Sequence, residues 1–143
     1  MGLLVRALTA LALSSLIGCA QQPARDDSLY RALGEEAGIT RIVEGMLLNI
    51  AADPRIVRHF QDIDIQRLRD KLIEQFCVEA GGPCTYTGDS MEESHKGQQL
   101  TRSDFNALVE NLTDAMEAQG VPMPAQNRLL ARLAPMRGQI IER

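Results

Sequence analysis

Residues 81–105 read GGPCTYTGDSMEESHKGQQLTRSDF, and this stretch decides the fold. Gly-Gly-Pro at its start ends any preceding helix, and the polar run after it has room for one short helical turn, around residues 91–95. Thr101, with Asp104 three residues later, resembles a capping box and predicts that a long helix starts there. A compact domain seldom tolerates such a loop-rich segment without a reason. Either it is a flexible surface loop, or it wraps a bound group that completes the core; the aromatic content of 3% favours the second.

On both sides of this segment, apolar residues recur at helical spacing, and no run alternates long enough to form a sheet. The sequence therefore predicts an all-α domain with about four substantial helices. The apolar stripes of these helices are Ile42, Met46, Leu47 and Ile50; Ile65, Leu68, Leu72 and Phe76; Phe105, Leu108, Val109, Leu112 and Met116; and Leu129, Leu130, Leu133, Met136 and Ile140.

Glycine, proline and N-capping aspartate residues set the expected helix boundaries. We expect Gly38 to separate the first long helix from what precedes it, and Asp53-Pro54 to start a short helix as N-cap and first helical residue. Asp64 is expected to cap the next helix. Pro135 should kink or interrupt the last one.

Composition and missing motifs exclude several functions. The net charge is −4 and the sequence pI about 5.2, so the chain has no basic surface for nucleic acid. Close-spaced zinc ligands, a nucleophile elbow and a phosphate-binding glycine loop are all absent from the sequence. Three cysteines are too few for a disulfide scaffold.

The N-terminus is typical of a targeting segment. Arg6 followed by a short apolar run predicts a signal peptide over residues 1–18. The run ends in Leu-Ile-Gly-Cys at residues 16–19, which resembles a bacterial lipobox in which Cys19 is lipidated. Ala20 follows, which in lipoprotein sorting indicates the periplasmic face of the outer membrane. We then expect a tether over residues 19–28 and a domain over residues 29–143; a simple cleaved signal is the alternative.

Several separated motifs in one ungapped register resemble the group 1 truncated hemoglobins, over about residues 28–141. This resemblance implies a two-over-two helical sandwich around haem b. The motifs are Leu29-Tyr30 to Leu33-Gly34, Ala52-Asp53-Pro54, Phe60, Gly81-Gly82-Pro83, Tyr86-Thr87-Gly88, His95 and Phe105.

The resemblance assigns His95 as the proximal ligand of the haem iron, with the opposite face open to a diatomic gas. The other site residues that it implies are Phe60 against the haem face, Leu47, Leu68 and Leu72 on the distal side, Phe105 and Leu108 at the haem edge and proximal side, and Lys71 beside a propionate. Ordinary core packing would give the same apolar pattern, and Lys71 could equally be a solvated lysine.

Two departures from the family concern the gas ligand. Many members have Tyr at the position of Leu47 and often Gln at that of Leu72, whereas this chain offers no donor at Leu47, Leu68 or Leu72. A hydrogen bond to a partly charged ligand contributes about 1.5–3 kcal/mol, so we expect fast oxygen release. His59 precedes Phe60, and could approach the iron or a propionate or lie exposed at a corner.

Cys77 and Cys84 bracket the Gly-Gly-Pro turn. In an oxidising compartment they could form a disulfide that closes a short loop; two free thiols are the alternative. If Cys19 carries lipid, no odd cysteine remains, which favours pairing.

These observations predict a haem protein that binds dioxygen, carbon monoxide or nitric oxide, anchored to the membrane through Cys19, with an unidentified reductase as a conceivable partner. The apolar distal side argues against a dedicated nitric oxide dioxygenase. The alternatives are a haem-based nitric oxide detoxifying enzyme, and a haem-free helical lipoprotein that acts as an interaction module. His95 speaks against the haem-free form, which would not need it.

Overall fold

The computed structural model describes residues 26–141, and every regular element in that range is helical, which confirms the all-α prediction. The elements are α1 (Ser28–Ala32), α2 (Glu35–Ala52), η1 (Val57–Phe60), α3 (Ile65–Glu79), α4 (Met91–His95), α5 (Arg102–Ala118), α6 (Met123–Leu133), η2 (Ala134–Met136) and α7 (Arg137–Ile140). The four longest, α2, α3, α5 and α6, are the predicted substantial helices.

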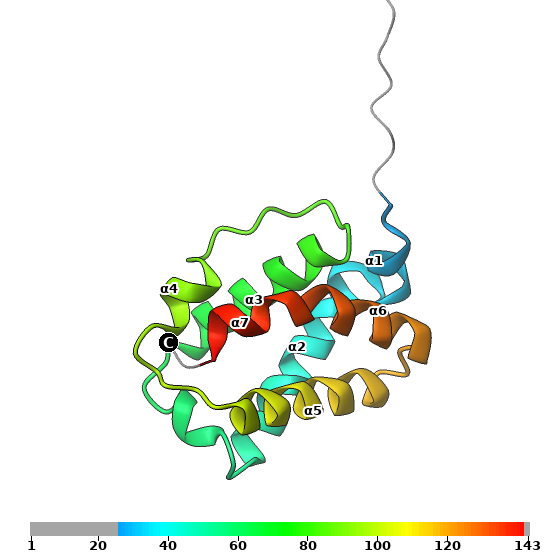
Figure 1. The fold of residues 1–143 in the computed structure, drawn as a ribbon. Coiled ribbons are helices and arrows are strands. Elements are labelled where there is room, and N and C mark those ends of the chain that lie inside the picture. The colour runs from blue at the N-terminus through cyan, green and yellow to red at the C-terminus, as the bar shows by residue number, and fades with distance from the viewer. Residues whose placement is uncertain (1–25, 142–143) are drawn as a thin grey trace, which may run out of the picture.

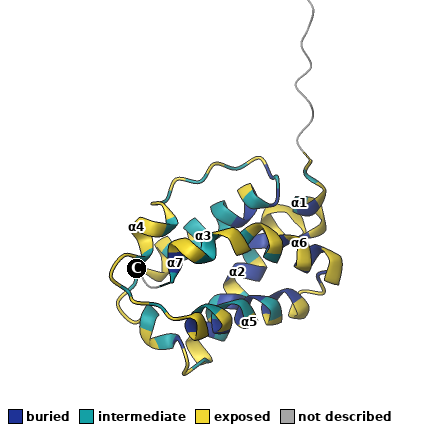
Figure 2. Ribbon diagram, in the orientation of Figure 1, coloured by how far each residue is buried: buried dark blue, intermediate teal, exposed yellow. Residues whose placement is uncertain are grey.

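These four helices form two pairs, α2 with α3 and α5 with α6 (Figure 1). The pairs pack on each other because α2 lies against α5 and α3 lies against α6, which gives the two-over-two arrangement. The buried faces point inward between the pairs (Figure 2). The largest fully buried side chains are Ile39, Ile42, Met46, Ile56, Met116 and Leu129. The short helix α4 stands at one end and packs against α7.

Local sequence signals explain most of the boundaries. Asp64 caps α3 by accepting a hydrogen bond from the Arg67 N–H at 3.0 Å. Thr101 and Asp104 form the predicted capping box at the start of α5. Pro135 interrupts the last helix as expected, because η2 separates α6 from α7 there.

The expected role of Gly38 was wrong. The break lies at Gly34, whose φ is 86°, and α2 starts directly after it, so that Gly38 falls inside the first turns. Glycine is needed at position 38 for a different reason: a Cβ there would lie 2.0 Å from the carbonyl oxygen of Leu33. The close approach of the turn between α1 and α2, at Leu33, to the start of α2 therefore explains this glycine.

Two details around η1 and α3 also differ from the prediction. Asp53 ends α2 as its C-cap and does not start a helix; the next helical residue is Val57. The Asp53 carboxylate instead accepts from the backbone N–H of Arg55 at 3.0 Å and so stabilises the turn. Ile65 begins α3 but is 42% exposed, so the buried stripe of this helix begins later.

The predicted signal segment, Cys19 and most of the tether lie outside the described residues. Ser28, the last residue of that predicted tether, is the first residue of α1. Within residues 26–141, no helix combines the length and the apolar character needed to cross a bilayer.

Candidate functional site

His95 is held in a defined orientation by its own short helix. Ser90 caps α4 by accepting from the Glu93 N–H at 3.2 Å. The His95 ring places Nδ1 2.7 Å from the carbonyl oxygen of Met91. A carbonyl can only accept, so Nδ1 carries a proton, and in the neutral ring Nε2 then has the lone pair. The ring is partly buried, and Nε2 has no partner among residues 26–141. Histidines that bind a metal usually donate the other ring N–H to a carbonyl or carboxylate in this way, which fixes the orientation of the ring.

The apolar residues assigned to the site share an intermediate burial. All of them keep part of their surface, although neighbours on the same helices such as Met46, Phe76 and Leu112 are almost fully buried. The partly buried residues are Leu47, Phe60, Leu68, Leu72, Phe105 and Leu108. Four of them, Leu47, Phe60, Leu72 and Leu108, pack against the main core cluster. Each of these apolar side chains is therefore left partly uncovered by the described chain.

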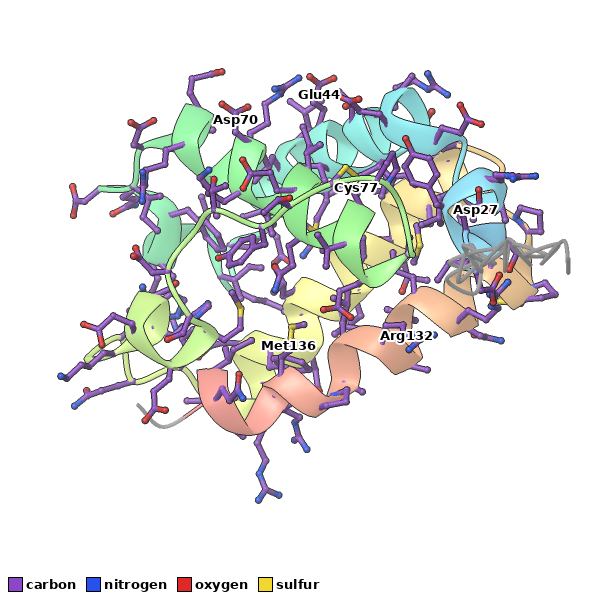
Figure 3. All side chains as sticks on the ribbon, turned by 90° about the horizontal axis from the view of Figure 1, so that it is seen from above. Asp27, Glu44, Asp70, Cys77, Arg132 and Met136 are labelled. Carbon is purple, nitrogen blue, oxygen red and sulfur yellow. A yellow bond between two sulfur atoms is a disulfide. The ribbon has the colours of Figure 1, made fainter. Side chains whose placement is uncertain are left out.

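Gln75 links the helix that carries Leu68 and Leu72 to α4. Its Nε2 lies 3.4 Å from Sδ of Met91 and 3.2 Å from Sδ of Met136. The three residues line part of a pocket of about 310 Å³ between α3, α4 and η2, and Figure 3 labels Met136 at this place. Gln75 was missed from sequence, although its spacing of three and seven residues from Leu72 and Leu68 puts it on the same helical face.

His59 is directed to the start of α5. Its Nε2 lies 3.4 Å from Oδ1 of Asp104. This nitrogen is buried and makes no hydrogen bond to any residue in the range 26–141. Arg58 reaches the same Asp104 oxygen at 3.2 Å. Hydrogen bonds from the Thr101 backbone and hydroxyl lower the pKa of Asp104, and His59 adds to this effect against the opposing effect of burial. His59 therefore faces the Asp104 carboxylate at the start of α5.

Lys71 is already paired. Its Nζ donates to Oε1 of Glu74 at 2.8 Å and to the hydroxyl of Thr87. The Thr87 N–H donates to the other Glu74 oxygen at 2.8 Å. Lys71 first, and then the Thr87 N–H, lower the pKa of Glu74 from 4.5 to about 2. The predicted contact of Lys71 with a propionate stays a prediction.

Cys77 and Cys84 form the predicted disulfide, which fastens the end of α3 to the segment that leads to α4 (Figure 3). Gly82 lies inside this loop, and a Cβ there would come within 2.5 Å of the Cys77 sulfur and 2.6 Å of the Tyr30 ring. The Gly-Gly-Pro turn therefore needs glycine at position 82 for packing. The segment runs from the end of α3 to α4 along one side of the molecule (Figure 1).

Arg137 is a second residue that sequence reasoning missed. Its guanidinium carbon lies 5.8 Å from the centre of the Phe105 ring. The contact depends on how α7 folds back beside the start of α5, so no local pattern could have indicated it.

No group of three or more His, Cys, Asp and Glu residues that could hold a bare metal ion occurs in the described range. Any metal at His95 would thus have to bring most of its own ligands. This requirement, the partly buried apolar side chains and the Nε2 without a partner in the described range together suit a flat, apolar metal chelate.

Known proteins resemble this chain over nearly the whole described domain. The family model of the bacterial-like globins matches residues 28–142. The group 1 truncated hemoglobin of Mycolicibacterium paratuberculosis is 31% identical over 79% of this chain and 83% of its own length. The truncated hemoglobin of Tetrahymena pyriformis, solved in its Fe(III) form, superimposes with a TM-score of 0.78 at 26% identity, over 80% of this chain and 98% of its own.

A 2/2 hemoglobin from Synechococcus, solved with covalently attached heme, shares the fold with a TM-score of 0.74 at 24% identity, over 80% of this chain and 98% of its own. The helix arrangement and the extent of these matches agree, and the chain belongs to the bacterial-like globin family, among the group 1 truncated hemoglobins.

Proposed function

We propose that this globin carries haem b on His95 and binds a diatomic gas reversibly at the opposite face of the iron. Haem-based gas binding is what membership of the truncated globins implies, and haem b is the usual cofactor of such proteins. The observation that carries the proposal for His95 is the hydrogen bond from its Nδ1 to the Met91 carbonyl at 2.7 Å. It fixes the tautomer in which Nε2 can act as a metal ligand.

The residues present fit this cofactor. Haem supplies an iron centre that needs one axial ligand from the protein and leaves a position for a gas. The partly buried apolar side chains described above offer a surface that a porphyrin would cover, and covering it removes apolar area from water at roughly 25 cal/mol per Å². His95 would hold the iron, while Phe60 and Leu72 would contact the porphyrin faces.

The side chains assigned to the distal side determine which gas is favoured. Leu47, Leu68 and Leu72 cannot donate a hydrogen bond, so a ligand that gains negative charge receives no stabilisation from them. His59 faces Asp104 in this structure, 3.4 Å away. We therefore propose a binder that releases dioxygen readily and holds carbon monoxide or nitric oxide with less penalty, and not an efficient dioxygenase.

The two histidines of the chain provide a matched test of the iron ligand. The purified full chain, loaded with haem, is compared with His95→Ala and His59→Ala by absorption spectra of the ferric, ferrous and carbonyl forms. We expect His95→Ala to lose most haem affinity and to recover part of the spectrum with added imidazole, while His59→Ala keeps the wild-type spectrum. An unchanged ferrous carbonyl spectrum in His95→Ala would exclude His95 as the ligand.

We also propose that the globin is a lipoprotein held at the periplasmic face of the outer membrane through Cys19. Support comes from the Leu-Ile-Gly-Cys motif after a short apolar run and from Ala20 directly after it. Cys19→Ala should abolish labelling by palmitate and stop maturation. Labelling that persists in this variant would show that the lipobox interpretation is wrong.

A further inference from the structure

Arg137 is a partly buried cation without an anionic partner. Its Nε is buried and makes no hydrogen bond within residues 26–141. No carboxylate of that range forms an ion pair with it, and its one recorded contact is the Phe105 ring at 5.8 Å. A buried N–H without an acceptor is unfavourable, so this position suggests a hydrogen-bond acceptor that the described chain does not supply.

The other partly buried basic side chains show the contrast. Among the described Lys and Arg residues, only Arg69, Lys71 and Arg137 are of intermediate burial. Arg69 pairs with Glu44 at 2.7 Å and Lys71 pairs with Glu74 at 2.8 Å. Arg137 alone in this group lacks a carboxylate. The lysine that the family resemblance assigns to a propionate is thus already paired with Glu74, whereas Arg137 has no carboxylate partner within residues 26–141.

Arg137 also lies beside residues of the candidate site. It begins α7, which packs against α4 and therefore against the helix of His95. It follows Met136, whose sulfur contacts Gln75 beside the 310 Å³ pocket. Its stacking partner Phe105 is one of the partly buried residues expected at the haem edge. A cation at this place can therefore meet a negatively charged group on the cofactor.

We propose that Arg137 binds a propionate carboxylate of haem. Its guanidinium would donate hydrogen bonds to the carboxylate oxygens while it remains stacked on the Phe105 ring. This inference rests on the proposed function, since it needs haem at His95. The chemistry is complementary: a guanidinium has several donors in a planar fork that matches a carboxylate. Phe105 supplies the flat surface that keeps the fork in place.

Removing the carboxylate charge of the cofactor tests the pairing without altering the protein. Haem b and the dimethyl ester of iron protoporphyrin IX are loaded into the full chain in one non-ionic detergent. The readout is the rate at which each leaves for an excess of a tight-binding acceptor apoprotein. The variants are Arg137→Met, which keeps the stem and loses the charge, and Arg69→Met as the matched control, because Arg69 is equally of intermediate burial and is not assigned to the site.

Arg137→Met is expected to lose haem b at least about tenfold faster than wild type, the effect of one charge-assisted hydrogen bond. Arg69→Met should change the rate less than about twofold, because the Arg69 guanidinium pairs with Glu44 and Asp70 and is not assigned to the cofactor. With the diester, Arg137→Met and wild type should lose the cofactor at equal rates, and Arg137→Lys should lie between Met and wild type with haem b.

The inference is overturned if Arg137→Met and wild type lose haem b at the same rate, or if the Arg137→Met effect persists undiminished with the diester, which would indicate packing alone. If far-ultraviolet circular dichroism shows that Arg137→Met does not fold, two other measurements decide whether the inference holds. These are the rate of haem b loss from Arg137→Lys and the comparison of haem b with the diester in wild type. Equal rates of loss of both cofactors from wild type also overturn the inference. Failure of the wild type to bind either cofactor would refute the proposed function instead.

Discussion

Placing a hydrogen-bond donor at position 47 should convert a fast oxygen releaser into a slow one. Leu47 is partly buried on α2 and packs against the core cluster, directly after the fully buried Met46. The resemblance puts it on the distal side of the iron. In Leu47→Tyr the phenol can donate to a gas ligand that carries partial negative charge, which no residue assigned to the distal side can do in the wild type.

The expected change in oxygen affinity follows from the strength of a hydrogen bond to a charged ligand. A hydrogen bond to a charged acceptor contributes about 1.5–3 kcal/mol, which corresponds to roughly 10–150-fold in an equilibrium constant. Because the gain stabilises the ligand after it has bound, we expect most of it in the dissociation rate. Carbon monoxide carries little charge, so its dissociation rate should change far less than that of oxygen.

Stopped-flow mixing of the oxygenated ferrous protein with excess carbon monoxide measures the oxygen dissociation rate. Leu48→Tyr is the matched control, since Leu48 is the next residue of α2 but is 73% exposed and should leave the rate unchanged. An oxygen dissociation rate in Leu47→Tyr equal to that of wild type would show that residue 47 does not face the ligand. Equal slowing for both gases would refute the electrostatic reasoning.

Three further outcomes are expected. Replacing Cys77 and Cys84 together by Ser opens a short loop and should lower the free energy of unfolding by about 2.5 kcal/mol in urea titrations; an unchanged midpoint would show that the disulfide does not stabilise the fold. The lowered pKa of Glu74, about 2 against an ordinary 4.5, means that its carboxylate stabilises the fold above pH 4.5 and that this contribution is lost as the pH falls toward 2. Thermal melts of Glu74→Gln should therefore vary less with pH in that window than wild-type melts, and parallel curves would contradict the role of the Lys71 pair. His59→Ala should leave the ferric coordination state unchanged because the ring faces Asp104; a change from six to five ligands would instead identify His59 as the sixth ligand.

The sequence was sufficient for the fold because its signals are local. Apolar spacing and the caps at Asp64 and Thr101 act within a few residues of the chain, and the structure has helices where they predict them. Gly38 was misplaced because glycine permits both a left-handed turn and a close helix contact. The second use depends on how closely the turn at Leu33 approaches α2, which the sequence does not display.

The candidate site also contains residues that local sequence signals could locate and residues that depend on contacts between distant parts of the chain. His95 could be located from its motif, and its carbonyl partner Met91 lies four residues earlier on the same short helix. Gln75 shares a helical face with Leu72, but its contacts are with sulfur atoms on α4 and η2, and the sequence does not show that these elements lie beside α3. Arg137 could not be predicted, since its stacking on Phe105 joins residues that are far apart in the chain.

The identity of the iron ligand is tested most directly by resonance Raman spectroscopy of the ferrous, gas-free full chain loaded with haem. A low-frequency iron–histidine stretching band should appear in wild type and in His59→Ala, shift when a heavier iron isotope is used, and vanish in His95→Ala reconstituted with haem. A band that survives unchanged in His95→Ala, or one that disappears only in His59→Ala, would contradict the assignment of His95 as the residue that holds the iron.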